Sequence, residues 1–211
     1  MNRGFQSVER IVENNPMKKY KYISFIGGIL AVLCYLVFAL LAFSRYLMPY
    51  SPMKNWLSDL GSVELNPDGA IFYNIGIIST ALFLIVFFLG LSVWKIEDKK
   101  GQIIMLRLTH AFGILGSFCM MMSAIYPINL YEIHAFWSTS LYILLSTAFI
   151  FSVAMLRYHQ KVPRWLLILG ISIALMVILT NFFPNVYLLE WITVFLLLNY
   201  VALLGIETKR M

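Results

Sequence analysis

Six long apolar stretches run through this chain, and short polar segments separate them. Each stretch holds roughly 20 residues, the length at which an α-helix crosses about 30 Å of hydrocarbon. Membrane spans are predicted at residues 22–47, 70–94, 103–126, 133–156, 165–183 and 188–206. A transmembrane β-barrel would need short strands of alternating polarity, which the sequence lacks. The pattern therefore predicts an all-α polytopic membrane protein, a six-helix transmembrane bundle that forms a single domain over residues 1–211.

Basic residues fall almost entirely into alternate segments between the spans. One set of segments holds Arg3, Arg10, Lys18, Lys19, Lys21, Lys95, Lys99, Lys100, Arg107, Arg157, Lys161, Arg164, Lys209 and Arg210. The other set holds only Arg45 and Lys54. Because basic residues near span ends resist translocation, we predict that both termini are cytoplasmic and that the protein resides in the cell membrane.

Composition agrees with this class, since 61% of the 211 residues are hydrophobic and only 12% are charged. The net charge of +6 lies on one predicted side. It therefore indicates topology and attraction to anionic lipid headgroups, so the lipid bilayer is the expected partner and nucleic acid is not. Cys34 and Cys119 both fall inside spans, which argues against a disulfide framework. The first span is too long for a typical signal-peptide core and is expected to stay as an anchor.

The segment before the first span, residues 1–19, allows two interpretations. Apolar residues recur there at helical spacing, at Phe5, Val8, Ile11 and Val12. This favours a helix lying on the cytoplasmic face of the membrane. A solvated tail fits the same residues.

The longest connection, residues 48–69, is predicted to carry a short amphipathic helix in the first outer loop. Ser51 and Pro52 are typical of a helix start, and Gly61 is placed to end the helix. Its apolar face consists of Met53, Trp56, Leu57 and Leu60, at i, i+3, i+4 and i+7. The polar face consists of Asn55, Ser58 and Asp59. Such a helix is expected to lie at the outer interface.

Local signals also indicate how the spans connect and pack. Residues 66–69 read Asn-Pro-Asp-Gly, with proline and glycine at the positions that a tight turn favours. Within the spans, Gly27 with Ala31 and Gly76 with Thr80 form small-residue pairs at i, i+4. Such pairs allow neighbouring helices to approach closely.

Polar residues gather near the predicted outer ends of the spans, where they define a candidate site. Polar groups are expensive in hydrocarbon, so those that remain are candidates for function. The candidate outer polar site consists of Asn55, Ser58, Asp59, Asn74, His134 and Ser138. We interpret Glu132 and Glu190 as interfacial residues in contact with water or a capping partner. No cofactor is expected; for a metal, only His134 with nearby acids remains an option, because His110 and His159 lie elsewhere.

The stretch Asn55-Trp-Leu-Ser-Asp-Leu-Gly61, followed by Asn66-Pro67 and Phe72-Tyr-Asn74, resembles the membrane family called domain of unknown function 998. The segment Gly113-Ile-Leu-Gly-Ser117, with Pro127 and His134, resembles its second half. The Ser-Asp-Leu-Gly core is more distantly similar to Frag/DRAM/Sfk six-span proteins, some of which are linked to lipid handling. The resemblance implies a membrane architecture, and it gives weight to Asn55, Ser58, Asp59, Asn74 and His134 and, as structural positions, to Gly61, Asn66 and Pro67.

Three functions remain open from these residues. The first is binding of a lipid or amphiphile at an outward-facing polar pocket, which the amphipathic loop over a polar mouth favours. The second is a lipid-headgroup hydrolase or transferase, with His134 or Asp59 as base and Ser58 or Ser138 as nucleophile. The third is a small-solute transporter, which the absence of mid-membrane charge and broken helices disfavours. Hydrolase and nucleotide-binding motifs are absent.

Overall fold

The computed structural model describes residues 16–183 and 186–211. The predicted interfacial helix falls mainly on residues 1–15, outside the described residues. Residues 16–19, which the sequence assigned to the same segment, begin the first described helix.

All regular structure in the described residues is helical. The long helices are α2 (Pro16–Phe43), α3 (Ala70–Gly90), α4 (Lys100–Ile125), α5 (Tyr131–Leu156), α6 (Arg164–Phe182) and α7 (Tyr187–Arg210), with short 3₁₀ helices η1 (Leu57–Gly61) and η2 (Leu91–Trp94). Five of these segments are long and apolar enough to cross a membrane, while α6 is a shorter apolar helix. The chain is therefore a multi-pass membrane protein, as its hydrophobic pattern predicts.

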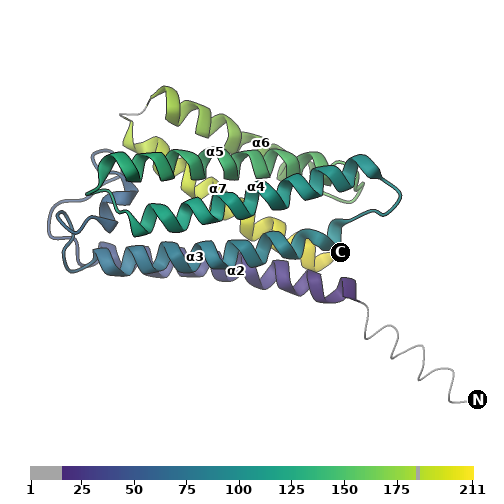
Figure 1. Cartoon of the computed structure of the whole chain (residues 1–211), viewed down its shortest axis with the longest axis horizontal. Helices are drawn as coiled ribbons and strands as arrows, with labels where there is room; N and C mark the ends of the chain where they lie inside the picture. Colours follow the sequence, from purple (N-terminus) through teal and green to yellow (C-terminus); the bar gives the residue numbers. More distant parts are fainter. Residues whose placement is uncertain (1–15, 184–185) are drawn as a thin grey trace, which may run out of the picture.

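Contacts between the six long helices close a ring, which Figure 1 shows from the side. Each helix packs mainly against its neighbours in the sequence, and α7 closes the ring against α2. Helix α2 begins and α7 ends at the same end of the bundle, which we call the terminal end. Residues 44–69 lie at the opposite end, called the loop end. Asn74, His134 and Ser138 of the candidate site lie on helices of this ring, whereas Asn55, Ser58 and Asp59 lie in the loop at its end.

Helices α2 and α3 approach closely because small residues line their seam. A Cβ atom added to Gly27 would lie 2.6 Å from the backbone nitrogen of Phe87. A Cβ atom on Gly90 would strike the backbone of Ser24. The hydroxyl of Thr80 donates to the carbonyl of Ala31 (3.3 Å), which joins the two predicted small-residue pairs across the seam.

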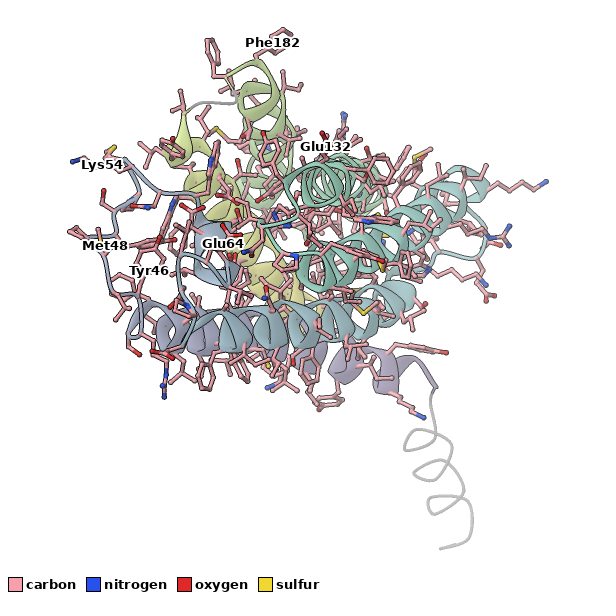
Figure 2. All side chains as sticks on the ribbon, turned by 60° about the vertical axis from the view of Figure 1, so that its left-hand side comes forward. Tyr46, Met48, Lys54, Glu64, Glu132 and Phe182 are labelled. Carbon is pink, nitrogen blue, oxygen red and sulfur yellow. The ribbon has the colours of Figure 1, made fainter. Side chains whose placement is uncertain are left out.

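Helix α6 meets α5 and α7 through side chains at Gly170, not through the backbone contacts seen between α2 and α3. A Cβ atom on Gly170 would lie 2.5 Å from a methyl group of Val153 in α5 and 3.0 Å from the ring of Tyr200 in α7. Towards the loop end, α6 diverges from α5 (Figure 1). Phe182, at the end of α6, points away from the bundle and is 76% exposed (Figure 2). The ring is thus tight at α2–α3 and open beside α6.

At the terminal end, Trp94 forms hydrogen bonds with residues of several segments. Its indole nitrogen donates to the hydroxyl of Thr208 (2.9 Å), and its carbonyl accepts from the buried amide of Gln102 (2.7 Å). The same carbonyl lies 2.9 Å from Nε2 of His159, in the α5–α6 connection. These bonds tie that connection to the α3 side of the ring.

The predicted loop helix is shorter than the sequence pattern suggested. Only Leu57–Gly61 is helical, as a 3₁₀ turn that ends at Gly61 as expected. Trp56 is extended (φ −65°, ψ 147°), and Met53 is 68% exposed instead of joining an apolar face. The side chain of Asn55 accepts from the amide of Ser51 (3.1 Å), an interaction that competes with regular helix formation. Loop residues therefore form successive turns.

Candidate functional site

Residues 50–66 cover the loop end of the ring, and we call this segment the loop roof. Its far end is held by Asn66, a buried residue whose amide donates to the carbonyls of Ala42 (3.1 Å) and Leu60 (2.9 Å). The amide of Gly69 donates to the carbonyl of Asn66 (3.1 Å), so residues 66–69 form the turn that contains Pro67. Asn66 thus links the roof to the end of α2.

Gly61 and Asn74 join the loop roof to α3. The side-chain amide of Asn74 donates to the carbonyl of Gly61 (3.1 Å). A Cβ atom at Gly61 would lie 2.5 Å from Oδ1 of Asn74 and 2.8 Å from the ring of Tyr73. A glycine at this position therefore permits the close approach.

Asn55 and Asp59 stabilise the loop roof from within. One carboxylate oxygen of Asp59 accepts from the amide of Trp56 (3.1 Å) and from the side chain of Asn55 (3.4 Å). Burial raises the pKa of Asp59, and these two hydrogen bonds oppose that rise. The carbonyl of Asn55 also accepts from the indole of Trp191 in α7 (3.1 Å). Neither Asn55 nor Asp59 lines the cavity described next, although the sequence grouped both with the pocket.

Glu190 in α7 also meets the loop roof from below. It is 8% exposed, and its Oε2 atom accepts from the amide of Leu57 at 2.6 Å. The hydroxyl of Tyr142 in α5 donates to Oε1 at 3.5 Å. The sequence interpreted Glu190 as an interfacial or capping residue. It does cap the roof helix, but it also lies inside the bundle, because the roof folds over it.

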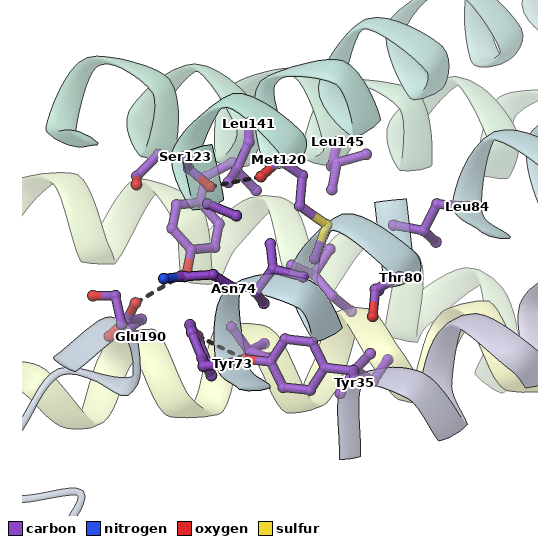
Figure 3. Close-up of a pocket in the computed structure, with 18 of the residues that line it drawn as sticks. Tyr35, Tyr73, Asn74, Thr80, Leu84, Met120, Ser123, Leu141, Leu145 and Glu190 are labelled. Atoms are coloured by element: carbon purple, nitrogen blue, oxygen red, sulfur yellow. Dashed lines mark hydrogen bonds between the residues drawn. The ribbon is translucent and has the colours of Figure 1, made fainter. Parts of the chain in front are cut away.

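A cavity of about 80 Å³ lies inside the ring beneath the loop roof (Figure 3). Four residues of the predicted site line it: Ser58, Asn74, His134 and Ser138. Residues outside the predicted site complete its polar and aromatic wall: Tyr35, Tyr73, Tyr142 and Glu190. The hydroxyls of Tyr35 and Tyr73 lie 3.4 Å apart (Figure 3). Its deeper wall is apolar and includes Leu84, Leu145 and Phe149.

A vestibule of about 200 Å³ adjoins the cavity. The two spaces share Ser58, Ile128, His134, Ser138, Tyr142 and Glu190. The vestibule adds Trp56 from the roof, Thr139 from α5 and Thr180 from α6. Thr139 is exposed, so the vestibule extends from the cavity to the outer surface of the bundle between α5 and α6.

A separate apolar groove of about 270 Å³, which shares no lining residue with the vestibule, lies further along the seam between α5 and α6. Ile143, one helical turn after Thr139, begins the groove on α5, and Ala174 and Ile178 face it from α6. The cavity thus has polar groups at its loop end and a mainly apolar wall, and the vestibule and the groove follow one another along the α5–α6 seam.

His134 has a defined orientation. Its Nδ1 atom lies 2.9 Å from the carbonyl oxygens of both Ser123 and Tyr126. A carbonyl oxygen only accepts, so the hydrogen resides on Nδ1, and in the neutral ring Nε2 is left as an acceptor. Within the described residues, no hydrogen bond joins His134 to Ser138 or Ser58. The imidazole is thus oriented, but neither serine is bonded to it as a nucleophile.

The site shows no metal-binding arrangement. No group of three or more His, Cys, Asp or Glu residues in the described part of the chain could hold a metal ion. Glu190 bonds to a backbone amide and a phenol, and His134 bonds to carbonyls. The groups available in the cavity wall are therefore hydrogen-bond donors and acceptors, the free Nε2 of His134 and apolar surface.

A closed ring of apolar helices, most of them long enough to cross a bilayer, defines a polytopic helical membrane protein. The chain belongs to the family described as "Protein of unknown function (DUF998)", whose sequence profile matches residues 28–207. This confirms the family predicted from the Asn55–Asn74 motifs, and the matched range contains the loop roof and every residue named above as lining the cavity. No curated protein and no solved structure matches the chain significantly.

Proposed function

We propose that this protein binds a lipid or another amphiphile at a polar pocket facing the outer side of the membrane. The observation that carries the proposal is the order of three neighbouring spaces: the cavity with its polar groups at the loop end, the vestibule that shares residues with it, and the apolar groove that begins one helical turn further along α5. A polar headgroup would enter the cavity, and its acyl chain would lie along the groove. An amphiphile matches both environments at once, whereas a small polar solute would leave the groove unused.

We also propose that all six helices span the membrane as one domain and that the loop end faces outward. Support for this orientation comes from charge. Lys95, Lys99, Lys100, Arg157, Lys161 and Arg164 lie in or beside the terminal-end connections. The connection that forms the loop roof holds only Arg45 and Lys54. Basic residues are retained on the cytoplasmic side, so the cavity would open towards the outer leaflet.

Size restricts what enters the cavity. A pocket for a drug-sized molecule usually measures about 300–1,000 Å³, and the cavity is much smaller at about 80 Å³. It is nevertheless several times larger than the roughly 10–15 Å³ that one water molecule needs. A headgroup of a few heavy atoms therefore suits the cavity, while the rest of the molecule remains in the vestibule and groove.

Blocking the vestibule tests the proposal. Purified protein would be reconstituted in vesicles of phosphatidylethanolamine, phosphatidylcholine and phosphatidylglycerol, extracted in mild detergent and examined by native mass spectrometry. We expect Thr139→Trp to reduce the fraction of protein that retains a lipid about tenfold, equivalent to about 1.4 kcal/mol of binding energy. Thr139 is exposed and lines the vestibule, so the indole would fill the opening without entering the core.

Thr147→Trp is the matched control, because Thr147 lies two turns further along α5 and lines neither the cavity, the vestibule nor the groove. It should retain lipid like the unmodified protein. Equal retention in both variants, or no retention in the unmodified protein, would contradict the proposal.

A lipid-headgroup hydrolase or transferase remains a second candidate, which the geometry of His134 favours. Its fixed Nδ1–H leaves Nε2 free to act as a base towards the cavity and vestibule that it lines. Incubation of the purified protein with the same three lipids would yield free headgroup or lysolipid if this candidate were correct, and His134→Gln would abolish the product. Unchanged lipids after prolonged incubation would exclude hydrolysis of these substrates.

A further inference from the structure

The described residues that line the cavity include an acidic side chain but no Lys or Arg. Glu190 is the single carboxylate among these described residues. Glu190 is also almost fully buried. A carboxylate removed from water needs either protonation or a partner of opposite charge.

A second carboxylate lies directly above. Asp59 accepts from the amide of Trp56, and Glu190 accepts from the next amide along the roof, that of Leu57. Asp59 is only 7% exposed. Within residues 16–183 and 186–211, neither acid forms an ion pair with Lys, Arg or His. Two neighbouring buried acids without a cation therefore place carboxyl oxygens, and no competing basic group, at the loop end of the cavity.

Aromatic rings form much of the remaining wall. Tyr35, Tyr73, Tyr142 and Phe149 come from three different helices and surround the same space. The faces of aromatic rings carry partial negative charge and attract cations, which is how proteins recognise quaternary ammonium groups. The aromatic residues of the wall therefore supply rings of the kind that attract positive charge.

The hydrogen-bonding groups agree with this charge. Nε2 of neutral His134 is an acceptor, and the hydroxyls of Ser58 and Ser138 can accept as well as donate. A primary ammonium group has only donors, and the quaternary ammonium of choline has neither donors nor acceptors, so such a wall accommodates both without adding another cation. A phosphate oxygen entering the cavity would instead meet Glu190 with no basic residue to offset the repulsion.

We propose that the group bound in the cavity is the ammonium headgroup of an amphiphile, held between Glu190 and the surrounding tyrosine rings. This inference rests on the proposed function, since it specifies the headgroup of the same ligand. The volume agrees: a cavity of about 150 Å³ holds benzene, so about 80 Å³ suits an ammonium group with its nearest carbons. The phosphate would then lie in the vestibule beside the hydroxyls of Thr139 and Thr180.

The test uses three lipids with identical acyl chains, namely dioleoyl phosphatidylethanolamine, phosphatidylcholine and phosphatidylglycerol. Only the first two carry ammonium. The protein would be reconstituted in vesicles of equal proportions, and retained lipids would be measured by native mass spectrometry. We expect the two ammonium lipids together to be enriched at least about tenfold over phosphatidylglycerol, relative to their abundance.

Glu190→Gln should abolish this enrichment while still retaining lipid, because glutamine keeps the acceptor for Leu57 but loses the charge. Glu132→Gln is the matched control. Glu132 is an exposed carboxylate near the loop end of α5, and it does not line the cavity. It should leave the enrichment unchanged. Should Glu190→Gln fail to fold, Tyr142→Leu provides a second variant, which removes one aromatic face and should lower the enrichment.

The outcomes separate the two levels of the hypothesis. Retention of phosphatidylglycerol equal to or above that of the ammonium lipids, with Thr139→Trp still blocking binding, would overturn the headgroup inference and leave lipid binding intact. Retention of no lipid would overturn both. An added arm with free ethanolamine and choline tests the source of the ammonium group: displacement of lipid by either at millimolar concentration would overturn the assignment to an amphiphile.

Discussion

The two sides of the helix ring are built in different ways. Along α2 and α3, glycines bring the backbones together, as Gly27 does against Phe87 and Gly90 against Ser24. Around α6, only Gly170 gives a comparably close approach, and the loop-end half of the helix diverges to leave the vestibule and the groove. Close packing fixes the shape of a protein, while incomplete packing provides space for a ligand. In this ring, the open side is the one that reaches the polar cavity.

Replacing a small residue by a larger one should reduce stability most where the helices pack most closely, between α2 and α3. Gly27→Leu would force a side chain into the backbone of α3, so we expect a loss of about 3 kcal/mol of stability, at the upper end for overpacking. For a chain of this size the melting temperature in detergent should fall by roughly 6–12 °C. Thermal unfolding followed by circular dichroism would measure it.

Ala174→Leu is the matched change on the open side, because Ala174 lines the apolar groove. The added carbons would enter the groove, so the melting temperature should change by less than about 2 °C. A similar loss in both variants would mean that the two sides are equally packed, contrary to the comparison drawn here.

A smaller effect on stability is expected at the terminal end, where a hydrogen bond joins the α5–α6 connection to Trp94. His159 lies in the α5–α6 connection, and its Nε2–H donates to the carbonyl of Trp94 beside α3. Burial lowers the pKa of His159, although this hydrogen bond partly offsets the effect. Since the pKa in the folded protein lies below its value in the unfolded chain, the stability from neutral His159 is present above the ordinary histidine pKa of about 6.5 and is lost as the pH falls through the folded value.

The melting temperature should therefore decrease slightly as the pH is lowered from 7.5 to about 5, and His159→Gln should make this dependence smaller. Lys161, Glu207 and Arg210 line the recess that contains His159, so the variant is compared with the unmodified protein at each pH. An identical pH dependence in both proteins would show that His159 does not contribute.

Much of the fold could be predicted from the sequence because the determining signals are local. The helix positions follow from long apolar runs, and the turn at residues 66–69 follows from its Pro and Gly. Close packing at Gly27 and Thr80 followed from their spacing with small neighbours. The loop helix was overestimated, because Asn55 and Asp59 bind backbone amides of the roof and favour turns instead of a longer helix.

The candidate site could be predicted only in part, because it depends on contacts between distant segments. His134 and Ser138 lie one turn apart on α5, so their common position in the cavity wall has a local signal. Glu190 contacts Leu57, which is 133 positions away, and no periodicity links them. Tyr35 and Tyr142 lie within apolar runs, where they resemble ordinary core residues until the ring closes. The predicted depth of Asp59 in the membrane places it with the other outer polar residues, but Asp59 lies in the loop roof above the cavity and does not line it.

The central claim, that an amphiphile occupies the path from the cavity to the α5–α6 groove, is tested most directly by photo-crosslinking. A phosphatidylethanolamine with a diazirine in its acyl chain would be incorporated into vesicles with the protein, and modified peptides would be identified by mass spectrometry. We predict that modification concentrates on the groove, near Ile143 and Ala174, and that Thr139→Trp removes it. Modification spread evenly over lipid-facing residues such as Leu33 and Leu40 of α2, unchanged by Thr139→Trp, would contradict the claim.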